Sequence, residues 1–361
     1  MFKSVLFFLI LSIATNQKLE AQGNIVSEDE ALKIAKEIQT SINNQDGSVL
    51  KVFFDMPSFF EKIKQQSTAA KNDDLFTGFK STFNMNTFAS QVAANVSDGG
   101  YQLVHVYASD GKRHLLFRLF GKSGLNYHDY SLIKRDGVVK ADDVYVYVSG
   151  EDMSTTVAVL VDVSMSGTTD LNQISEELNT LLKLKEYQKN KDYNSIIKLF
   201  ESSEAKYKKN NAFQIIYIGA CHQQDLQKYK AALENYAVTF PDAPNTYLLM
   251  LDLYFLSKEY EKGIAAVDKL DSLVRGDTFL DFYRGNLYLA LKEPLKAKLC
   301  YDNVFKSFPV LSYVIKNVVI LHMNDNEAEA AKSALNIYKV TKGFKQQYVD
   351  DIYLLYPQLK D

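Results

Sequence analysis

Cysteine is scarce in this sequence, because its 361 residues include only Cys221 and Cys300. So few cysteines exclude a small domain held together by disulfides. An excess of positive charge is also missing, since 41 Lys and Arg residues stand against 44 Asp and Glu residues. That balance excludes a nucleic-acid binder that works by electrostatic attraction. With 47% hydrophobic residues, the chain is also too apolar to be disordered and can build the cores of two domains.

Motifs for common catalytic chemistry are absent as well. The five histidines form no HExxH pair and the two cysteines form no CxxC pair; the histidines are His105, His114, His128, His222 and His322. A GxSxG nucleophile motif and a glycine-rich phosphate loop are missing too. We therefore expect no metal and no cofactor, and we expect binding rather than turnover.

The first 22 residues have the pattern of an export signal. Lys3 precedes an apolar run from Val5 to Leu11, and small residues follow at Ser12 and Ala14. Cleavage after Ala14 and cleavage after Ala21 both remain open. The run is shorter than the roughly 20 apolar residues of a membrane span, and no later segment reaches that length. We therefore expect residues 1–22 to be a signal peptide, the mature chain to have no transmembrane segment, and the protein to be periplasmic or extracellular.

The rest of the chain changes character near residue 172. Residues 24–170 mix helix and strand patterns, whereas residues 173–361 are helical almost throughout. The stretch from Ser154 to Asp170 has no Lys or Arg. We expect its apolar half to be a last strand and its end, at Gly167 to Thr169, to be the linker between two domains.

Helix signals dominate the start of the first domain. Ser27 and Glu30 form a capping box, and apolar residues at helical spacing follow them. A second helix is expected to begin at Pro57, because proline suits the first helical turn. A third is expected to run from Leu75 through Phe88.

Four strands follow these helices, over residues 101–108, 114–120, 125–133 and 143–150. The dipeptides Asp110-Gly111 and Asp136-Gly137 separate them in pairs and predict tight hairpin turns. Helices followed by an antiparallel meander predict an α+β domain whose sheet is covered by helices on one face.

This arrangement resembles the NTF2-like fold, in which helices pack on a curved antiparallel sheet. The segments 124–129 and 143–151 also resemble those of bacterial proteins that join such a domain to helical repeats. The resemblance implies a cone-shaped α+β domain. NTF2-like domains include isomerases, dehydratases and binding modules, so the resemblance does not choose among these activities.

The second half of the chain repeats itself. Five anchors lie 31 to 36 residues apart, at Tyr193, Tyr229, Tyr260, Pro294 and Ala328. A small residue follows three positions after four of them, and a large apolar residue seven positions after each. The pattern resembles tetratricopeptide repeats, which are stacked helical hairpins. It implies an all-α solenoid over residues 173–361, closed by a cap helix. It also places the two cysteines in different repeats, which predicts two buried free thiols.

A solenoid of this kind presents the first helix of each hairpin on a concave groove that binds a protein or peptide partner. The resemblance places these residues in the groove: Tyr217, Cys221 and Gln224; Asn245, Leu248, Asp252 and Phe255; Phe282, Asn286 and Leu289; and Lys316, Ile320 and Met323. The alternative is that the aromatic and aliphatic members only pack against neighbouring helices. Recognition of a partner in this groove is the function we predict.

A second candidate site is a polar cluster on the predicted sheet. A two-residue turn at Asp110-Gly111 pairs Tyr107 with His114, His105 with Leu116, and Leu103 with Arg118. A simple loop before the next strand adds Tyr127 and Asp129 to the same face. The cluster is then His105, His114, Arg118, Tyr127 and Asp129.

This cluster supports a small-ligand pocket, or an enzyme of the isomerase or hydratase type that uses general acid/base chemistry. The alternative is a solvated face with an Arg118–Asp129 ion pair. The opposite face, with Val104, Val106, Leu115, Phe117 and Leu119, is more apolar, and helices could cover either face.

Overall fold

The computed structural model describes residues 25–121, 124–166, 176–205, 207–241 and 243–360. The signal-peptide prediction for residues 1–22 and the linker prediction at residues 167–169 lie outside these ranges. The chain divides into two compact units. The first comprises residues 1–96, 101–147 and 151–182, and the second comprises residues 97–100, 148–150 and 183–361.

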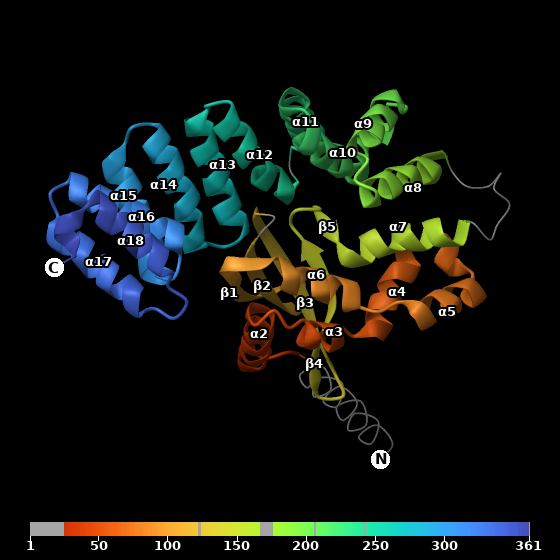
Figure 1. Ribbon diagram of the computed structural model, residues 1–361. Coiled ribbons are helices and arrows are strands. Elements are labelled where there is room, and N and C mark those ends of the chain that lie inside the picture. Colours follow the sequence, from red (N-terminus) through yellow and green to blue (C-terminus); the bar gives the residue numbers. More distant parts are fainter. Residues whose placement is uncertain (1–24, 122–123, 167–175, 206, 242, 361) are drawn as a thin grey trace, which may run out of the picture. The chain divides into compact units, whose positions relative to one another are not determined.

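The first unit begins with five α-helices and one short 3-10 helix (Figure 1): α2 (Glu28–Asn43), α3 (Ser48–Phe53), α4 (Met56–Gln66), η1 (Ala69–Lys71), α5 (Asp73–Thr82) and α6 (Asn86–Asn95). The predicted capping box is confirmed, because Ser27 accepts from the Glu30 amide and the Glu30 carboxylate accepts from the Ser27 amide. Asp55 caps α4, which has proline in its first turn as predicted.

The single helix predicted from Leu75 through Phe88 is wrong, because two helices occupy that segment. The backbone of Phe83 is extended, with φ −74° and ψ 136°, which ends α5. The Asn84 side chain then accepts a 3.0 Å hydrogen bond from the Asn86 amide and starts α6. Asparagine competes with helical hydrogen bonding in this way, so the break is local.

One antiparallel sheet follows, in the order β1-β2-β3-β4-β5. Its strands are β1 (Val96–Ser109), β2 (Lys112–Gly121), β3 (Gly124–Arg135), β4 (Val138–Val146) and β5 (Glu151–Asp152). Both residues of Asp110-Gly111 and of Asp136-Gly137 have positive φ. These are the tight hairpin turns that the dipeptides predicted.

The register of β1 differs from the prediction at one point. Tyr107 pairs with His114 and His105 with Leu116 as predicted, but Leu103 pairs with Phe117 instead of Arg118. Val104 is an extra residue in β1, and such a β-bulge shifts the register of every residue beyond it. Leu103 therefore packs on the helix-covered core, which also contains Leu115, Phe117 and Leu119.

The last strand predicted for residues 154 onward is also wrong. The segment is a helix, α7 (Met153–Ser166), and Val157, Ala158 and Val161 are buried at helical spacing in the same core. The Ser154 hydroxyl and amide both donate to the buried Asp143 carboxylate, at 2.6 and 3.1 Å, and fix the start of the helix. Tertiary partners decide this segment, because its apolar run suits a strand or a helix equally.

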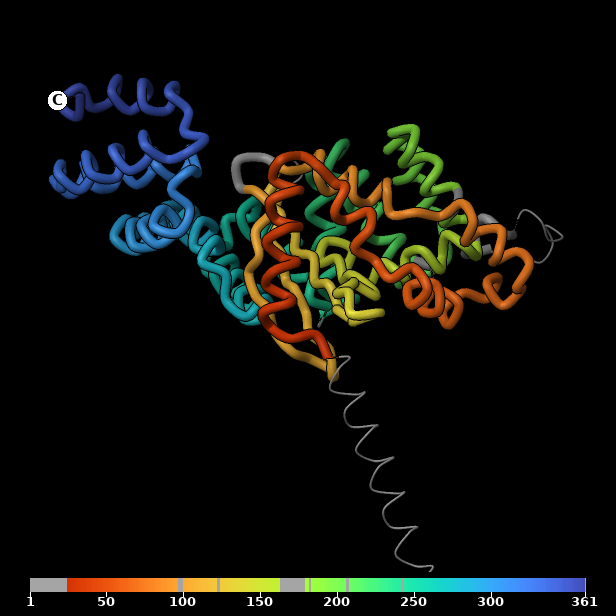
Figure 2. Tube along the Cα trace, turned by 90° about the horizontal axis from the view of Figure 1, so that it is seen from below, coloured from red at the N-terminus to blue at the C-terminus, as the bar shows by residue number. Residues whose placement is uncertain are grey.

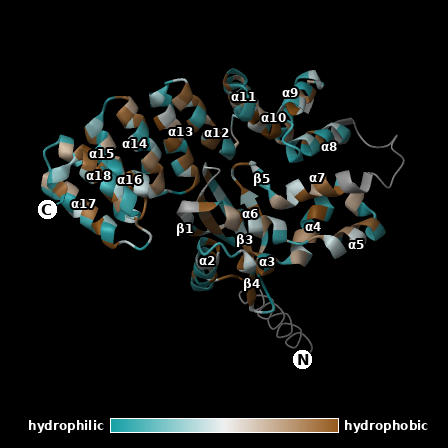
Figure 3. Ribbon diagram, in the orientation of Figure 1, coloured by the Kyte–Doolittle hydropathy of each residue, from teal (hydrophilic) through white to brown (hydrophobic). Residues whose placement is uncertain are grey.

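The second unit is an array of helices (Figures 1 and 2): α8 (Glu176–Lys189), α9 (Tyr193–Ser202), α10 (Asn211–Gln224), α11 (Leu226–Thr239), α12 (Pro244–Leu256), α13 (Tyr260–Leu273), α14 (Asp281–Ala290), α15 (Pro294–Ser307), α16 (Ser312–Asn324), α17 (Ala328–Val340) and α18 (Gln346–Leu355). Short 3-10 helices lie at Tyr207–Lys209, Thr278–Leu280 and Pro357–Leu359. Helices α10 to α17 pack in consecutive pairs as hairpins. The helices alternate hydrophobic and hydrophilic residues, which suits one packed side and one solvent-facing side (Figure 3).

The repeat is more regular than the sequence predicted. The second helices of the four hairpins begin at Leu226, Tyr260, Pro294 and Ala328, each 34 residues after the last. That spacing is the period of tetratricopeptide repeats. The predicted anchor Tyr229 is three residues late, because the Asp225 side chain accepts from the Gln227 and Lys228 amides and starts α11 earlier.

Both cysteines of the array are buried and free, as predicted. Within the described ranges, no helix is both long and apolar enough to cross a membrane.

Candidate functional site

Corrected for the true start of α11, the repeat defines one equivalent set of positions on three consecutive first helices. We call this set the first-helix stripe. It consists of Leu248, Asp252 and Phe255 on α12, Phe282, Asn286 and Leu289 on α14, and Lys316, Ile320 and Met323 on α16. The spacing places the three residues of each helix on one face. None of the nine is buried, and Phe255 and Leu289 are 51% and 37% exposed.

Two stripe residues on α14 also hold the array together. The half-buried Phe282 ring lies 5.0 Å from the ring of Tyr313 on α16, centroid to centroid. The Asn286 carboxamide donates to the Phe282 carbonyl and accepts a 2.8 Å hydrogen bond from the phenol of Tyr301 on α15. Asn286 therefore stabilises its own hairpin, and the exposed Leu289 is the α14 residue with the most accessible apolar surface.

The α12 residues of the prediction divide in the same way. Asp252 is exposed and accepts a 2.9 Å hydrogen bond from the phenol of Tyr229 on α11. Burial and the neighbouring Asp252 charge raise the pKa of that phenol. Asn245 is fully buried and donates to the Tyr236 phenol at 2.7 Å. The prediction that Asn245 faces the groove is therefore corrected: its amide is a buried partner of a tyrosine.

Two predicted residues of α10 lie off the stripe. With α11 starting at Leu226, the α10 positions equivalent to the stripe are Gln214, Ile218 and Cys221, and all three are buried. Gln224 is exposed as the last residue of α10, and Tyr217 faces a different part of the array. The sequence placed both residues on the stripe because its anchor in this repeat was three residues late.

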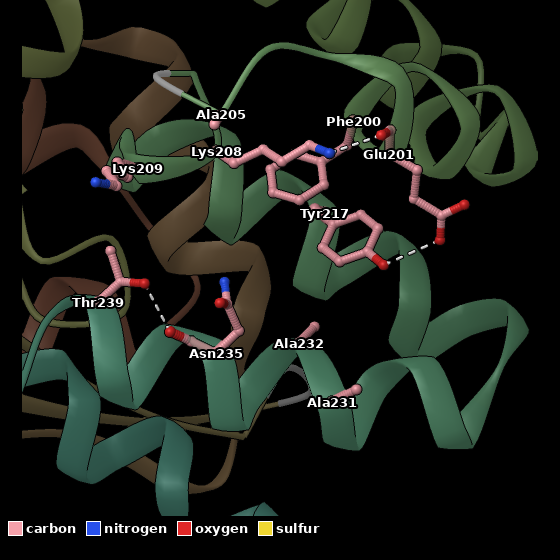
Figure 4. Close-up of a pocket in the computed structure, with 10 residues that line it drawn as sticks. All are labelled: Phe200, Glu201, Ala205, Lys208, Lys209, Tyr217, Ala231, Ala232, Asn235 and Thr239. Atoms are coloured by element: carbon pink, nitrogen blue, oxygen red, sulfur yellow. Dashed lines mark hydrogen bonds between the residues drawn. The ribbon is translucent and has the colours of Figure 1, made fainter.

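Tyr217 lines a cavity of about 420 Å³ formed by α9, α10, α11 and the connection before α10. Figure 4 shows the ten lining residues, which are Phe200, Glu201, Ala205, Lys208, Lys209, Tyr217, Ala231, Ala232, Asn235 and Thr239. The Phe200 and Tyr217 rings stack with centroids 4.1 Å apart and planes 13° apart. Small residues of α11 face them across the cavity (Figure 4). We call this cavity the α9–α11 pocket.

The carboxylate at one end of the α9–α11 pocket is already paired. Oε1 of Glu201 accepts from the Tyr217 phenol at 3.2 Å and from the Lys228 ammonium at 2.5 Å. The Lys228 pKa is raised, first by its hydrogen bond to Glu201. Burial, followed by interactions with Cys221 and Glu201, raises the pKa of the Tyr217 phenol. Lys208 donates to the Glu201 backbone carbonyl at 2.6 Å, a neutral partner that leaves its charge uncompensated.

In the first unit, the structure brings together part of the predicted polar cluster. Oδ1 of Asp129 lies 3.1 Å from Nδ1 of His114, and Oδ2 accepts from the Tyr107 phenol. The Tyr107 ring stacks on His114 at 4.9 Å. Tyr107 was missing from the predicted cluster, although its pairing with His114 was the signal that places it there.

The other members of the predicted cluster have different surroundings. Arg118 and Tyr127 are buried neighbours across β2 and β3, and His105 is half-buried on β1. Across the described residues, no group of three or more His, Cys, Asp or Glu side chains is placed to hold a metal ion.

A second polar group lies inside the core and was not predicted. The Tyr101 phenol lies 2.8 Å from the Tyr130 phenol and 3.0 Å from Nδ1 of His128, and all three side chains are buried. Burial lowers the pKa of His128 to about 4 and raises the pKa values of both phenols. His128 is therefore a neutral hydrogen-bonding partner near pH 7. The alternation of β3 places His128 and Tyr130 on the same face, which was the available signal.

The second unit is thus a solenoid of helical hairpins with a 34-residue period. No protein-family model matches the chain, and no curated protein matches it. Solved structures that resemble it include a MamA mutant, with a TM-score of 0.38 and 13% identity over 45% of this chain and 95% of that chain. Others are MamA AMB-1 (TM-score 0.36, 13% identity, 45% and 96%) and TTC0263, a thermophilic TPR protein in Thermus thermophilus (TM-score 0.33, 12% identity, 51% and 98%). Likeness at this level carries no conclusion about function.

Proposed function

We propose that this chain is a binding module that recognises a protein or peptide partner through the first-helix stripe. The observation that carries the proposal is the repetition of accessible positions 34 residues apart on α12, α14 and α16. Apolar, amide and charged side chains alternate along it, which suits protein recognition better than a uniform surface does. A partner that lies along the array would meet the same geometry three times.

Exposed apolar side chains are the part of the stripe that a partner can cover. Phe255 and Leu289 occupy equivalent positions on α12 and α14 and keep 51% and 37% of their surfaces exposed. Burying an aromatic or aliphatic side chain of this size contributes about 1.5 to 3 kcal/mol. These two residues are therefore the anchors that we expect to dominate binding.

The test starts from a random peptide library selected on the intact chain. Selected peptides should lose binding to a Phe255→Ser/Leu289→Ser variant and keep binding to a Leu295→Ser/Leu299→Ser control. The control removes two exposed leucines of α15, which are 64% and 65% exposed and lie outside the stripe. Equal binding to both variants, or a library that yields no binder, would contradict the proposal.

The first unit supports a second role. We propose that it is an NTF2-like domain that holds a small ligand near Asp129, because that carboxylate is 13% exposed and already positions a phenol and an imidazole. The same groups could serve as acid and base in an isomerase or hydratase. An Asp129→Asn variant should lose ligand-induced thermal stabilisation in a metabolite screen. If the variant and the parent chain respond alike, the ligand lies elsewhere.

Export is part of the proposal. The pattern of residues 1–22 supports a cleaved signal and a periplasmic or extracellular location. Mass spectrometry of the chain recovered from the cell envelope and culture fluid should find a mature N-terminus after Ala14 or Ala21. A chain recovered only from the cytoplasm with Met1 intact would contradict export.

A further inference from the structure

The α9–α11 pocket is not used by the first-helix stripe, and its chemistry is different. Phe200 covers one face of the Tyr217 ring, and the cavity lies on the α11 side of the stack (Figure 4). Ala231 and Ala232 face the rings across the cavity without filling it. The space of about 420 Å³ is within the usual range of ligand pockets, about 300 to 1,000 Å³. A planar ring fits between a tyrosine face and two alanine methyl groups, and stacking favours an aromatic one.

Charge defines the rest of the occupant. The charged lining residues are Glu201, Lys208 and Lys209, and Lys228 pairs with Glu201 from outside the lining. Three ammonium groups therefore face one carboxylate. Lys209 is exposed, lies toward the other end of the pocket from Glu201 (Figure 4), and forms no ion pair within the described part of the chain. This imbalance attracts an anion.

Polar recognition comes from Asn235. Its carboxamide points toward the aromatic rings (Figure 4) and makes no side-chain hydrogen bond among the described residues. Nearby, the Thr239 hydroxyl donates to the Asn235 backbone carbonyl at 2.7 Å. An amide offers both a donor and an acceptor, which is what a peptide backbone requires.

From these contacts we infer that the α9–α11 pocket is a separate docking site for an acidic peptide segment that inserts one aromatic side chain beside Tyr217. The ring occupies the space above Ala231 and Ala232, and the flanking carboxylates lie near Lys208 and Lys209. The site is independent of the first-helix stripe.

A related cavity shows which residues give this site its character. About 370 Å³ lies between α15, α16 and α17 at equivalent positions. There Asp302 replaces Glu201, Ile337 replaces Asn235 and Pro309 replaces Lys208. His322 contacts Asp302 at 3.0 Å. The second cavity thus lacks the amide and one of the lysines, and we expect it to leave the same peptide unbound.

The chain contains no tryptophan, which gives a direct test. The probe is the peptide Asp-Glu-Trp-Glu-Asp with acetylated and amidated ends, and its emission should shift to shorter wavelength when the indole enters the pocket. An Ala231→Leu variant fills the pocket at an exposed helix position and should weaken binding by about tenfold or more. The matched control is Ala265→Leu, which makes the same change 34 residues later on α13, outside the pocket.

Charge is tested separately. Lys209→Glu should weaken binding of the acidic probe, and added salt should weaken it further, because exposed charges are screened. The peptide Lys-Lys-Trp-Lys-Lys should not bind the parent chain. Absence of a saturable shift with the acidic probe, equal binding of the basic peptide, or unchanged binding in Ala231→Leu would each overturn the inference. Circular dichroism of Ala231→Leu and Ala265→Leu must match the parent chain, which excludes loss of folding as the cause.

Discussion

The phenol of Tyr301 on α15 donates a 2.8 Å hydrogen bond to Oδ1 of Asn286 on α14. Tyr301 is fully buried, so this amide is the polar partner that satisfies its hydroxyl inside the hairpin. The bond explains why an amide on an otherwise accessible face has a structural role. It also separates the two functions of α14, since Asn286 stabilises the hairpin and Leu289 offers surface to a partner.

Asn286→Ala should destabilise the chain by about 1 to 3 kcal/mol, because it leaves a buried hydroxyl without its partner. Urea unfolding followed by circular dichroism measures the change. Adding Tyr301→Phe should restore part of the loss, because both polar groups are then gone. Leu289→Ala, on the exposed side of the same helix, should change stability by no more than about 0.5 kcal/mol. Strictly additive effects of Asn286→Ala and Tyr301→Phe would contradict the pairing.

Two glycines on first helices should respond in opposite directions. A Cβ at Gly285 would lie 3.0 Å from the Tyr301 ring, whereas a Cβ at Gly219 would meet nothing within 4 Å. Gly285→Ala should therefore overpack the core and cost about 1 to 3 kcal/mol. Gly219→Ala should raise stability by up to about 1 kcal/mol, because alanine favours a helix. Thermal unfolding of the two variants distinguishes them, and equal shifts of Tm would refute the packing argument.

His128 should make the first unit less stable in acid. Its pKa is lowered from 6.5 to about 4 in the folded chain, so the unfolded chain binds a proton that the folded chain excludes. Stability is thus complete above pH 6.5 and declines as the pH falls from 6.5 toward about 4. At about 1.4 kcal/mol per pH unit, the loss over that interval is about 3 kcal/mol. Chemical unfolding of the parent chain and of His128→Gln should show that the variant lacks this share of the pH dependence.

The two thiols should react slowly in the native chain. Burial raises the pKa of Cys300 to about 11 and also raises the pKa of Cys221. Both residues are buried, and only the thiolate is nucleophilic. Titration with a colorimetric disulfide reagent should find two thiols per chain in denaturant and only slow labelling without it. Rapid labelling of either cysteine in the native chain would show that the array opens locally.

Local chemistry accounts for the features that the sequence predicted correctly. The capping box at Ser27 and Glu30 and the two Asp-Gly turns depend on residues that are neighbours in the chain. The 34-residue repeat could also be recognised, because each hairpin places small and large residues at fixed positions. The α9–α11 pocket could not, since its residues come from three helices and the connection before α10.

Errors arose where a distant or competing contact chose between two locally acceptable structures. Val104 is an ordinary strand residue, and only the pairing of β1 with β2 makes it a bulge. The apolar segment after Met153 suits a strand or a helix, and its packing in the core together with the bonds from Ser154 to Asp143 makes it α7.

The division into an α+β part and a helical array, the turns, most helix starts and the free thiols could all be predicted from the residues alone. Which array positions remain accessible depends on the packing of the helices. Asn245 and Asn286 are the same residue type, yet one is fully buried and the other is part of the stripe. Composition and spacing describe one helix at a time, whereas exposure depends on every helix packed around it.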